Sequence, residues 1–361
     1  MHFVKLTKIT VLIVFALLIL PLGVHAAPVI SAENGTFTHG QTVTVTGSGF
    51  GTKSPVAPLQ WDPVDGMYSS ISQGATVPTG GSNPWNSSGG SDMYDPSFTI
   101  TNTRGKFIAK YTNASSPSSV KNAVLGEKSW SQCAGAKLYL SYWVYPHQNP
   151  SNPGASNKYL RITDNGGWSS NVSFMIWDAG SGNILTYNLA TDYTGIYYQS
   201  TNGTVGAWNR LEVVIDNSVN PKPSVKASVN NATVVSFQSS PSLPANLTGI
   251  YTIGADWTNA QSSPIAQLDW GEIYVDSTLA RVEICNAATK TSSNHCEIQI
   301  PRTQWIDGQL QIQVNQGSFA NGSTAYLYVV DASGNVSAGS RITFGTSGTS
   351  GTEPPSAPIL N

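Results

Sequence analysis

The middle of the sequence is a long series of short segments in which apolar and polar residues alternate, each ended by Gly, Asn, Ser or Pro. Alternation with a period of two predicts β-strands with one buried face. No segment after residue 26 shows the 3.6-residue periodicity of an amphipathic helix. Because parallel strands need long crossover connections, strands joined this closely must pair antiparallel. The predicted fold class is therefore all-β, as a sandwich or barrel. The predicted strands cover 98–103, 106–112, 137–145, 158–163, 172–177, 195–200, 208–216, 224–230, 232–237, 250–256 and 267–276.

The N-terminus has the layout of a secretory signal peptide. Lys5 and Lys8 precede an apolar run from Ile9 to Leu20, and small residues around Ala26 follow. We therefore expect residues 1–26 to be removed and the protein to be secreted or held at the cell surface. No later segment approaches the roughly 20 apolar residues of a spanning helix, so no transmembrane segment is expected. Charged residues make up 11% of the chain and the net charge is −2, which argues against nucleic acid as a partner.

The two ends of the chain each contain too few strands for a sheet of their own. Residues 39–51, HGQTVTVTGSGFG, form one strand between two turns, and the middle segments do not resemble its neighbours. Further strand patterns resume at residue 279, in LARVEICN, HCEIQIP, QLQIQVNQ, TAYLYVVDASGN and SRITFG. Together the two ends supply about seven strands, the number in one immunoglobulin-like sandwich.

The glycine pattern of the first end resembles the start of an IPT/TIG domain, which has an immunoglobulin-like fold. Gly40, Gly47, Gly49, Phe50 and Gly51 match that pattern. This resemblance implies a split domain made of residues 27–57 and 278–345. The sequence is also similar, over 39–53 and 299–336, to secreted bacterial proteins with this layout, a resemblance that implies an architecture and no chemistry.

The middle of the chain resembles the concanavalin-like or laminin-G-like jelly roll. The segments that carry the resemblance are LYLSYWVYP, GAWNRLEVVIDNS, SVNNATVVSF and LDWGEIYVD. It implies that residues 58–277 form a second sandwich inserted into the first. Residues 346–361, rich in Gly, Ser, Thr and then Pro, are expected to form a flexible tail.

Three cysteines suggest one disulfide. Cys285 and Cys296 each lie in a strand pattern with a polar loop between them, which predicts a bond across two adjacent strands. Cys133 is expected to be a small buried apolar residue. The histidines are scattered and form no zinc motif. Calcium is the cofactor that the sequence leaves open, since oxygen ligands near turns could hold it. These candidate ligands are Asp164, Asn165 and Asp178.

The sequence favours binding over catalysis. Glu212 with Asp216, and Glu272 with Asp276, share strand faces but lie about 13 Å apart along the backbone, too far for either strand to supply the carboxylate pair of a hydrolase alone. Two strands together could still supply one. Trp85 and Trp168 lie in polar, Gly-rich loops and are candidate platforms for a sugar ring. We therefore expect a non-enzymatic surface protein that binds glycan or a neighbouring protein. A self-assembling subunit of an extracellular fibre or coat is one alternative. A polysaccharide lyase or glycoside hydrolase is the other.

Overall fold

The computed structural model describes residues 26–62, 78–81, 85–88, 98–100, 107–109, 123–146, 156–164, 172–176, 185–191, 195–201, 203–204, 206–219, 222–238, 245–258, 268–317, 319–345 and 347–348. Within these segments the strands pair antiparallel, and the helices are single 3₁₀ turns, η1 (Ser131–Cys133) and η3 (Lys290–Ser292). None of the helices among these residues is long and apolar enough to cross a membrane. The prediction of an all-β chain is confirmed.

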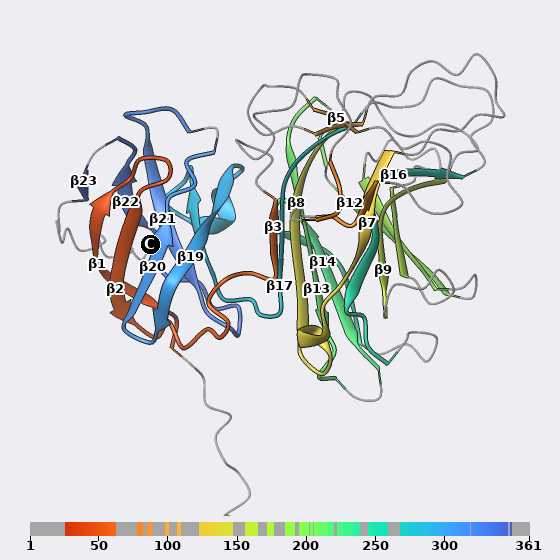
Figure 1. Cartoon of the computed structure of the whole chain (residues 1–361), viewed down its shortest axis with the longest axis horizontal. Helices are drawn as coiled ribbons and strands as arrows, with labels where there is room; N and C mark the ends of the chain where they lie inside the picture. The colour runs from red at the N-terminus through yellow and green to blue at the C-terminus, as the bar shows by residue number, and fades with distance from the viewer. Residues whose placement is uncertain are drawn as a thin grey trace, which may run out of the picture.

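One set of strands combines both ends of the chain, and we call it the terminal sandwich. Its strands pair in the order β22-β21-β18-β19-β20-β2-β1-β23. In Figure 1 the red strands β1 and β2 lie beside the blue strands β20 and β21. The bounds are β1 (Val29–Thr36), β2 (Thr42–Ser48), β18 (Arg281–Cys285), β19 (Cys296–Ile306), β20 (Gln309–Gln313), β21 (Thr324–Val330), β22 (Ser340–Thr343) and β23 (Ser347–Gly348).

Direct pairing between β2 and β20 joins the two ends. The register runs from Thr42 opposite Gln313 to Thr46 opposite Gln309. The Gly-rich turn after β2 also contacts the C-terminal half of the sandwich: the indole N–H of Trp305 donates to the carbonyl oxygen of Phe50 at 3.1 Å. Gly47 allows β1 to lie close to β2, since a Cβ there would lie 1.9 Å from the carbonyl oxygen of Val29. The neighbour of β2 that the nearby sequence does not supply, β20, therefore lies more than 250 residues later in the chain.

Strand β19 turns this sheet into a sandwich by pairing with different neighbours along its length. Its first residues pair with β18 and its later ones with β20, and the register shifts between Pro301 and Trp305. Proline lacks a backbone N–H, so it suits a bend where pairing changes. Between the two halves lies a core of buried apolar side chains from β2, β18, β20, β21 and β22.

The strands between the two ends form two further sheets, which we call the central sandwich. The junction sheet has the order β15-β14-β13-β8-β17-β6-β5, with β3 also on β17, and the outer sheet has the order β12-β11-β10-β9-β16-β7-β4. Figure 1 shows the junction sheet beside the terminal sandwich. The junction sheet consists of β3 (Gln60–Asp62), β5 (Phe98–Ile100), β6 (Phe107–Ala109), β8 (Lys137–Pro146), β13 (Asn209–Asp216), β14 (Ser224–Val229), β15 (Ala232–Gln238) and β17 (Leu268–Asp276). The outer sheet consists of β4 (Ser87–Ser88), β7 (Ala123–Ser129), β9 (Ser156–Thr163), β10 (Val172–Ile176), β11 (Leu185–Thr191), β12 (Gly195–Thr201) and β16 (Gly249–Thr258).

Both faces of strand β8, in the middle of the junction sheet, are buried. On β8, Leu138 and Leu140 are fully buried, and so is Tyr139 between them, 1% exposed. Tyr139 packs in a cluster with Ile298 of the terminal sandwich. At Tyr139, this second face therefore packs against the terminal sandwich. Every predicted strand is present, and the pattern missed β3, β4, β7, β11 and the two-residue β23, which lies in the expected tail and pairs with β1.

Candidate functional site

A network of buried charges connects β13 of the junction sheet to β18 of the terminal sandwich. The Arg210 guanidinium donates two hydrogen bonds to the Glu283 carboxylate, at 2.9 and 3.0 Å. Arg281 lies between Glu283 and Glu212, with Nε donating to Glu283 at 2.5 Å and Nη2 to Glu212 at 3.3 Å. The side chains of all four residues are at least nine-tenths buried. Two strands far apart in sequence are therefore held together by paired, desolvated charges.

Tyr139 and Lys290 complete the network. The Tyr139 hydroxyl donates to Glu212 at 2.6 Å, and the Arg281 guanidinium lies over the Tyr139 ring at 4.5 Å from its centroid. Lys290, on η3, forms an ion pair with Glu283 at 2.8 Å. The group thus combines three cations with two carboxylates and a phenol.

The network keeps Glu212 ionised and Tyr139 protonated by shifting their pKa values in opposite directions. Burial by itself would raise the pKa of Glu212, but the charges of Arg210 and Arg281 outweigh it and hold that pKa below its usual value. Burial raises the pKa of Tyr139 above its usual value, although Arg281 opposes the shift. At neutral pH Glu212 is therefore ionised and Tyr139 is protonated.

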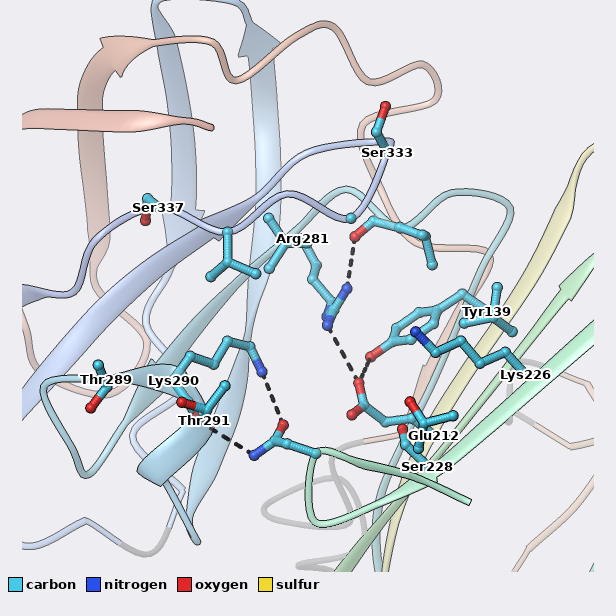
Figure 2. A pocket seen from close by; sticks show the side chains of 17 residues that line it. Tyr139, Glu212, Lys226, Ser228, Arg281, Thr289, Lys290, Thr291, Ser333 and Ser337 are labelled. Carbon is cyan, nitrogen blue, oxygen red and sulfur yellow. Dashed lines mark hydrogen bonds and ion pairs between the residues drawn. The ribbon is translucent and has the colours of Figure 1, made fainter. Parts of the chain in front are cut away.

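A cleft of about 520 Å³ opens over part of this network, between the two sandwiches. Figure 2 shows Tyr139, Glu212 and Lys226 on one side, and Arg281 and Lys290 on the other. Glu212 is the one carboxylate among the lining residues, against three cations. Hydroxyl groups complete the polar walls, and they come from Ser228, Thr233, Thr289, Thr291, Ser333 and Ser337.

Lys226 differs from the other two cations of the cleft. It is exposed, and no hydrogen bond or ion pair to it is found among the residues that the structure describes. Arg281 and Lys290 already contact carboxylates. The cleft therefore offers a free ammonium group, a surplus of positive charge and several hydroxyl groups, which together suit an anionic saccharide.

A second buried group crosses the junction outside this cleft. Glu272 accepts hydrogen bonds from Asn315 at 2.9 Å and from the indole N–H of Trp61 at 3.3 Å. Glu297, nearby, contacts the His295 imidazole at 2.8 Å. Burial, and then the charge of Glu297, raise the pKa of Glu272 well above its usual value. This carboxyl group keeps its proton at pH values where an exposed glutamate is ionised.

The structure corrects one expected sugar platform. Trp85 is 0% exposed, and its indole N–H donates to Asp62 at 2.9 Å. Its ring therefore cannot serve as an exposed platform. The prediction failed because a polar, Gly-rich sequence context does not reveal that the side chain turns inward. Trp168 lies outside the described residues.

The expected calcium ligands are described only in part. Asp164 is half-buried, and its backbone carbonyl oxygen accepts a hydrogen bond from Thr248 at 2.5 Å. Asn165 and Asp178 lie outside the described residues, so calcium binding at this set stays a prediction.

The predicted disulfide between Cys285 and Cys296 is confirmed. The two residues are directly opposite each other on β18 and β19, with Cα atoms 4.0 Å apart. Their sulfur atoms lie close to Glu283, but a disulfide offers no thiolate for a metal. Cys133 is a buried free thiol, and burial followed by the charge of Asp276 raises its pKa to about 12.

The sequence contained one signal for the charge network. Arg210-Leu211-Glu212 and Arg281-Val282-Glu283 repeat the same order of charged and apolar residues on two strands. In each strand the Arg and the Glu share one face because side chains alternate. Sequence analysis paired Glu212 only with Asp216, which contacts Lys137 at 2.9 Å and does not line the cleft.

No known protein family matches the sequence, and no curated protein does. Solved structures of similar shape include alginate lyase Aly36B, at 14% identity and a TM-score of 0.38 over 57% of this chain and 95% of that one. An endo-β-1,4-glucuronan lyase from Trichoderma reesei has 14% identity and a TM-score of 0.39 over 58% and 95%. An endo-1,3-β-glucanase from Streptomyces sioyaensis has 12% identity and a TM-score of 0.41 over 61% and 95%.

These comparisons correct the expected function. We expected a non-enzymatic, glycan-binding or adhesive protein, whereas the similar structures are named as two polysaccharide lyases and a glucanase. They agree with the alternative of a polysaccharide lyase or glycoside hydrolase. Sequence analysis ranked that alternative lower because it found no carboxylate pair on one strand.

Proposed function

We propose that this protein cleaves an acidic polysaccharide by β-elimination in the cleft between its two sandwiches. The observation that carries the proposal is the Tyr139–Glu212 hydrogen bond beside a cleft whose other charged groups are cations. Hydrolysis needs two carboxyl groups on either side of the scissile bond, and Glu212 is the one that lines the described cleft. Elimination does not have this requirement, so it fits the residues better.

The reaction assigns one role to each group. Lys226 binds the uronate carboxylate, and neutralising that charge makes the hydrogen on the adjacent carbon more acidic. Glu212, held ionised, accepts this proton. The electron pair forms a carbon–carbon double bond and breaks the bond to the glycosidic oxygen. Tyr139, held protonated, donates its proton to that oxygen as it leaves.

The proposal includes the architecture around the cleft. The terminal sandwich corresponds to a split immunoglobulin-like domain of the IPT/TIG kind, made of residues 27–57 and 278–345. The central sandwich, residues 58–277, corresponds to a concanavalin-like or laminin-G-like jelly roll. The protein is exported from the cell, and it meets its polysaccharide substrate outside.

The test uses the full chain with alginate, polyglucuronate and a neutral β-glucan. We expect ultraviolet-absorbing unsaturated ends from an acidic polymer and none from the glucan. Tyr139→Phe and Glu212→Gln should each lower the rate about 10²- to 10⁴-fold. Tyr326→Phe on β21, outside the cleft, is the matched control and should keep the wild-type rate.

Two results would contradict the proposal. New reducing ends without unsaturation would indicate hydrolysis instead of elimination. Full activity in both Tyr139→Phe and Glu212→Gln would show that the cleft is not where cleavage occurs.

A further inference from the structure

The loop between the two disulfide-bonded cysteines forms part of the cleft wall. This loop runs from residue 286 to 295 and contains η3. Three of its residues, Thr289, Lys290 and Thr291, line the cleft. The disulfide ties both ends of the loop to the terminal sandwich, but its middle faces the central sandwich.

One residue of the central sandwich holds the middle of this loop. Asn231 lies in the turn between β14 and β15. Its side-chain N–H group donates to the carbonyl oxygens of Ser293 at 3.2 Å and Lys290 at 3.5 Å. Its side-chain oxygen accepts a hydrogen bond from the Lys290 ammonium at 3.4 Å. Asn231 therefore holds both the backbone and the ammonium group of Lys290 in place.

The ammonium group of Lys290 has capacity for a ligand. It has three N–H donors. Among the described residues, Glu283 and Asn231 accept from two of them. The third remains for an anionic group in the cleft, and Figure 2 shows Lys290 among the residues that line it.

We propose that Lys290 is a specificity-determining residue for an anionic saccharide and that Asn231 is the positioning residue that aims it. This inference rests on the proposed function, since it assigns a role to a second cation of the same cleft. It also explains why the site needs both sandwiches: the cation comes from one and its support from the other.

The neighbouring turn residue provides a matched control. Asn230 and Asn231 both have positive φ, 48° and 67°, so glycine suits either position. The Asn230 side chain contacts Arg210 and Asn209 within the central sandwich and makes no contact with the loop among the described residues. Asn230→Gly therefore reproduces the backbone change without releasing Lys290.

The experiment measures calorimetric binding of a glucuronate tetrasaccharide to the full chain, with cellotetraose as the neutral comparison. We expect Asn231→Gly and Lys290→Met each to weaken glucuronate binding about tenfold and the double variant to be no weaker. Asn230→Gly should stay within about twofold of the wild type. In both weakened variants the affinity for the glucuronate tetrasaccharide should also depend less on salt concentration than in the wild type. A purely structural role would leave that salt dependence unchanged.

The outcomes separate this inference from the proposed function. Equal affinities for Asn231→Gly and Asn230→Gly, or wild-type affinity in Lys290→Met, would overturn the inference while leaving cleavage to be judged by its own assay. A wild type that binds the tetrasaccharide with the expected variant pattern, but produces no unsaturated ends, would overturn the lyase alone. A wild type that binds no acidic oligosaccharide would overturn both.

Discussion

Arg210 on β13 and Glu283 on β18 form a bidentate ion pair, with N–O distances of 2.9 and 3.0 Å, although 73 positions separate them in the sequence. Glu283 is 0% exposed. Burial disfavours its charge, but Arg210 and then Lys290 and Arg281 hold its pKa well below the usual value. The pair fixes the junction sheet against the terminal sandwich, and thereby the two walls of the cleft.

Removing one partner of this pair should destabilise the fold. Glu283→Gln leaves three buried cations with Glu212 as their one carboxylate, which should lower the free energy of unfolding by about 3–5 kcal/mol. Urea denaturation measures the change. Arg302→Gln, an exposed control on β19, should shift stability by less than about 0.5 kcal/mol. The double variant Arg210→Met with Glu283→Leu should cost less than the sum of its single changes. A loss no larger than the control's would show that the pair does not hold the junction.

Glu272 should make stability depend on pH. Its carboxyl group has a raised pKa in the folded protein, so the folded state binds more protons than the unfolded state between the two pKa values. Its contribution is complete below the unfolded pKa of about 4.3. It is lost as pH rises through the folded pKa. Glu272→Gln removes this titration, so the variant should gain stability relative to the wild type as pH rises.

Urea midpoints at a series of pH values measure this difference. Parallel curves for Glu272→Gln and the wild type would contradict a raised pKa at this position.

The three cysteines should react with iodoacetamide in a fixed order. Cys133 is 0% exposed and its pKa is raised to about 12, so the native protein should take up no label. Denaturation without reductant should add one label, on Cys133, and denaturation with reductant should add three. Peptide mass spectrometry locates each label. Label on Cys285 or Cys296 without reductant would contradict the disulfide.

Trp85→Ala should act on stability rather than on sugar binding. The ring is fully buried and hydrogen-bonded to Asp62, so its removal should cost about 3–5 kcal/mol. Ile306→Ala, at a side chain that is 47% exposed, is the control and should change stability little. A Trp85→Ala protein with wild-type stability but weaker glycan binding would contradict this prediction and support Trp85 as a sugar platform.

Strand patterns predicted most of the secondary structure, because side-chain alternation is a local property. The pattern failed for β7, whose sequence AVLGEKS does not alternate regularly, and for the three-residue β3. It failed for Trp85 for another reason: whether a loop side chain turns inward depends on distant residues such as Asp62, 23 positions away.

By itself the amino-acid sequence determined which residues share a strand face: Arg210 with Glu212, Arg281 with Glu283, and Cys285 in reach of Cys296, because strand geometry depends on near neighbours alone. Only the tertiary structure decided that the two charged faces meet. Their pairing depends on how one sandwich docks on the other, which the burial of many apolar and charged side chains determines together. The cleft lies at that contact, so its residues belong to neither sandwich alone.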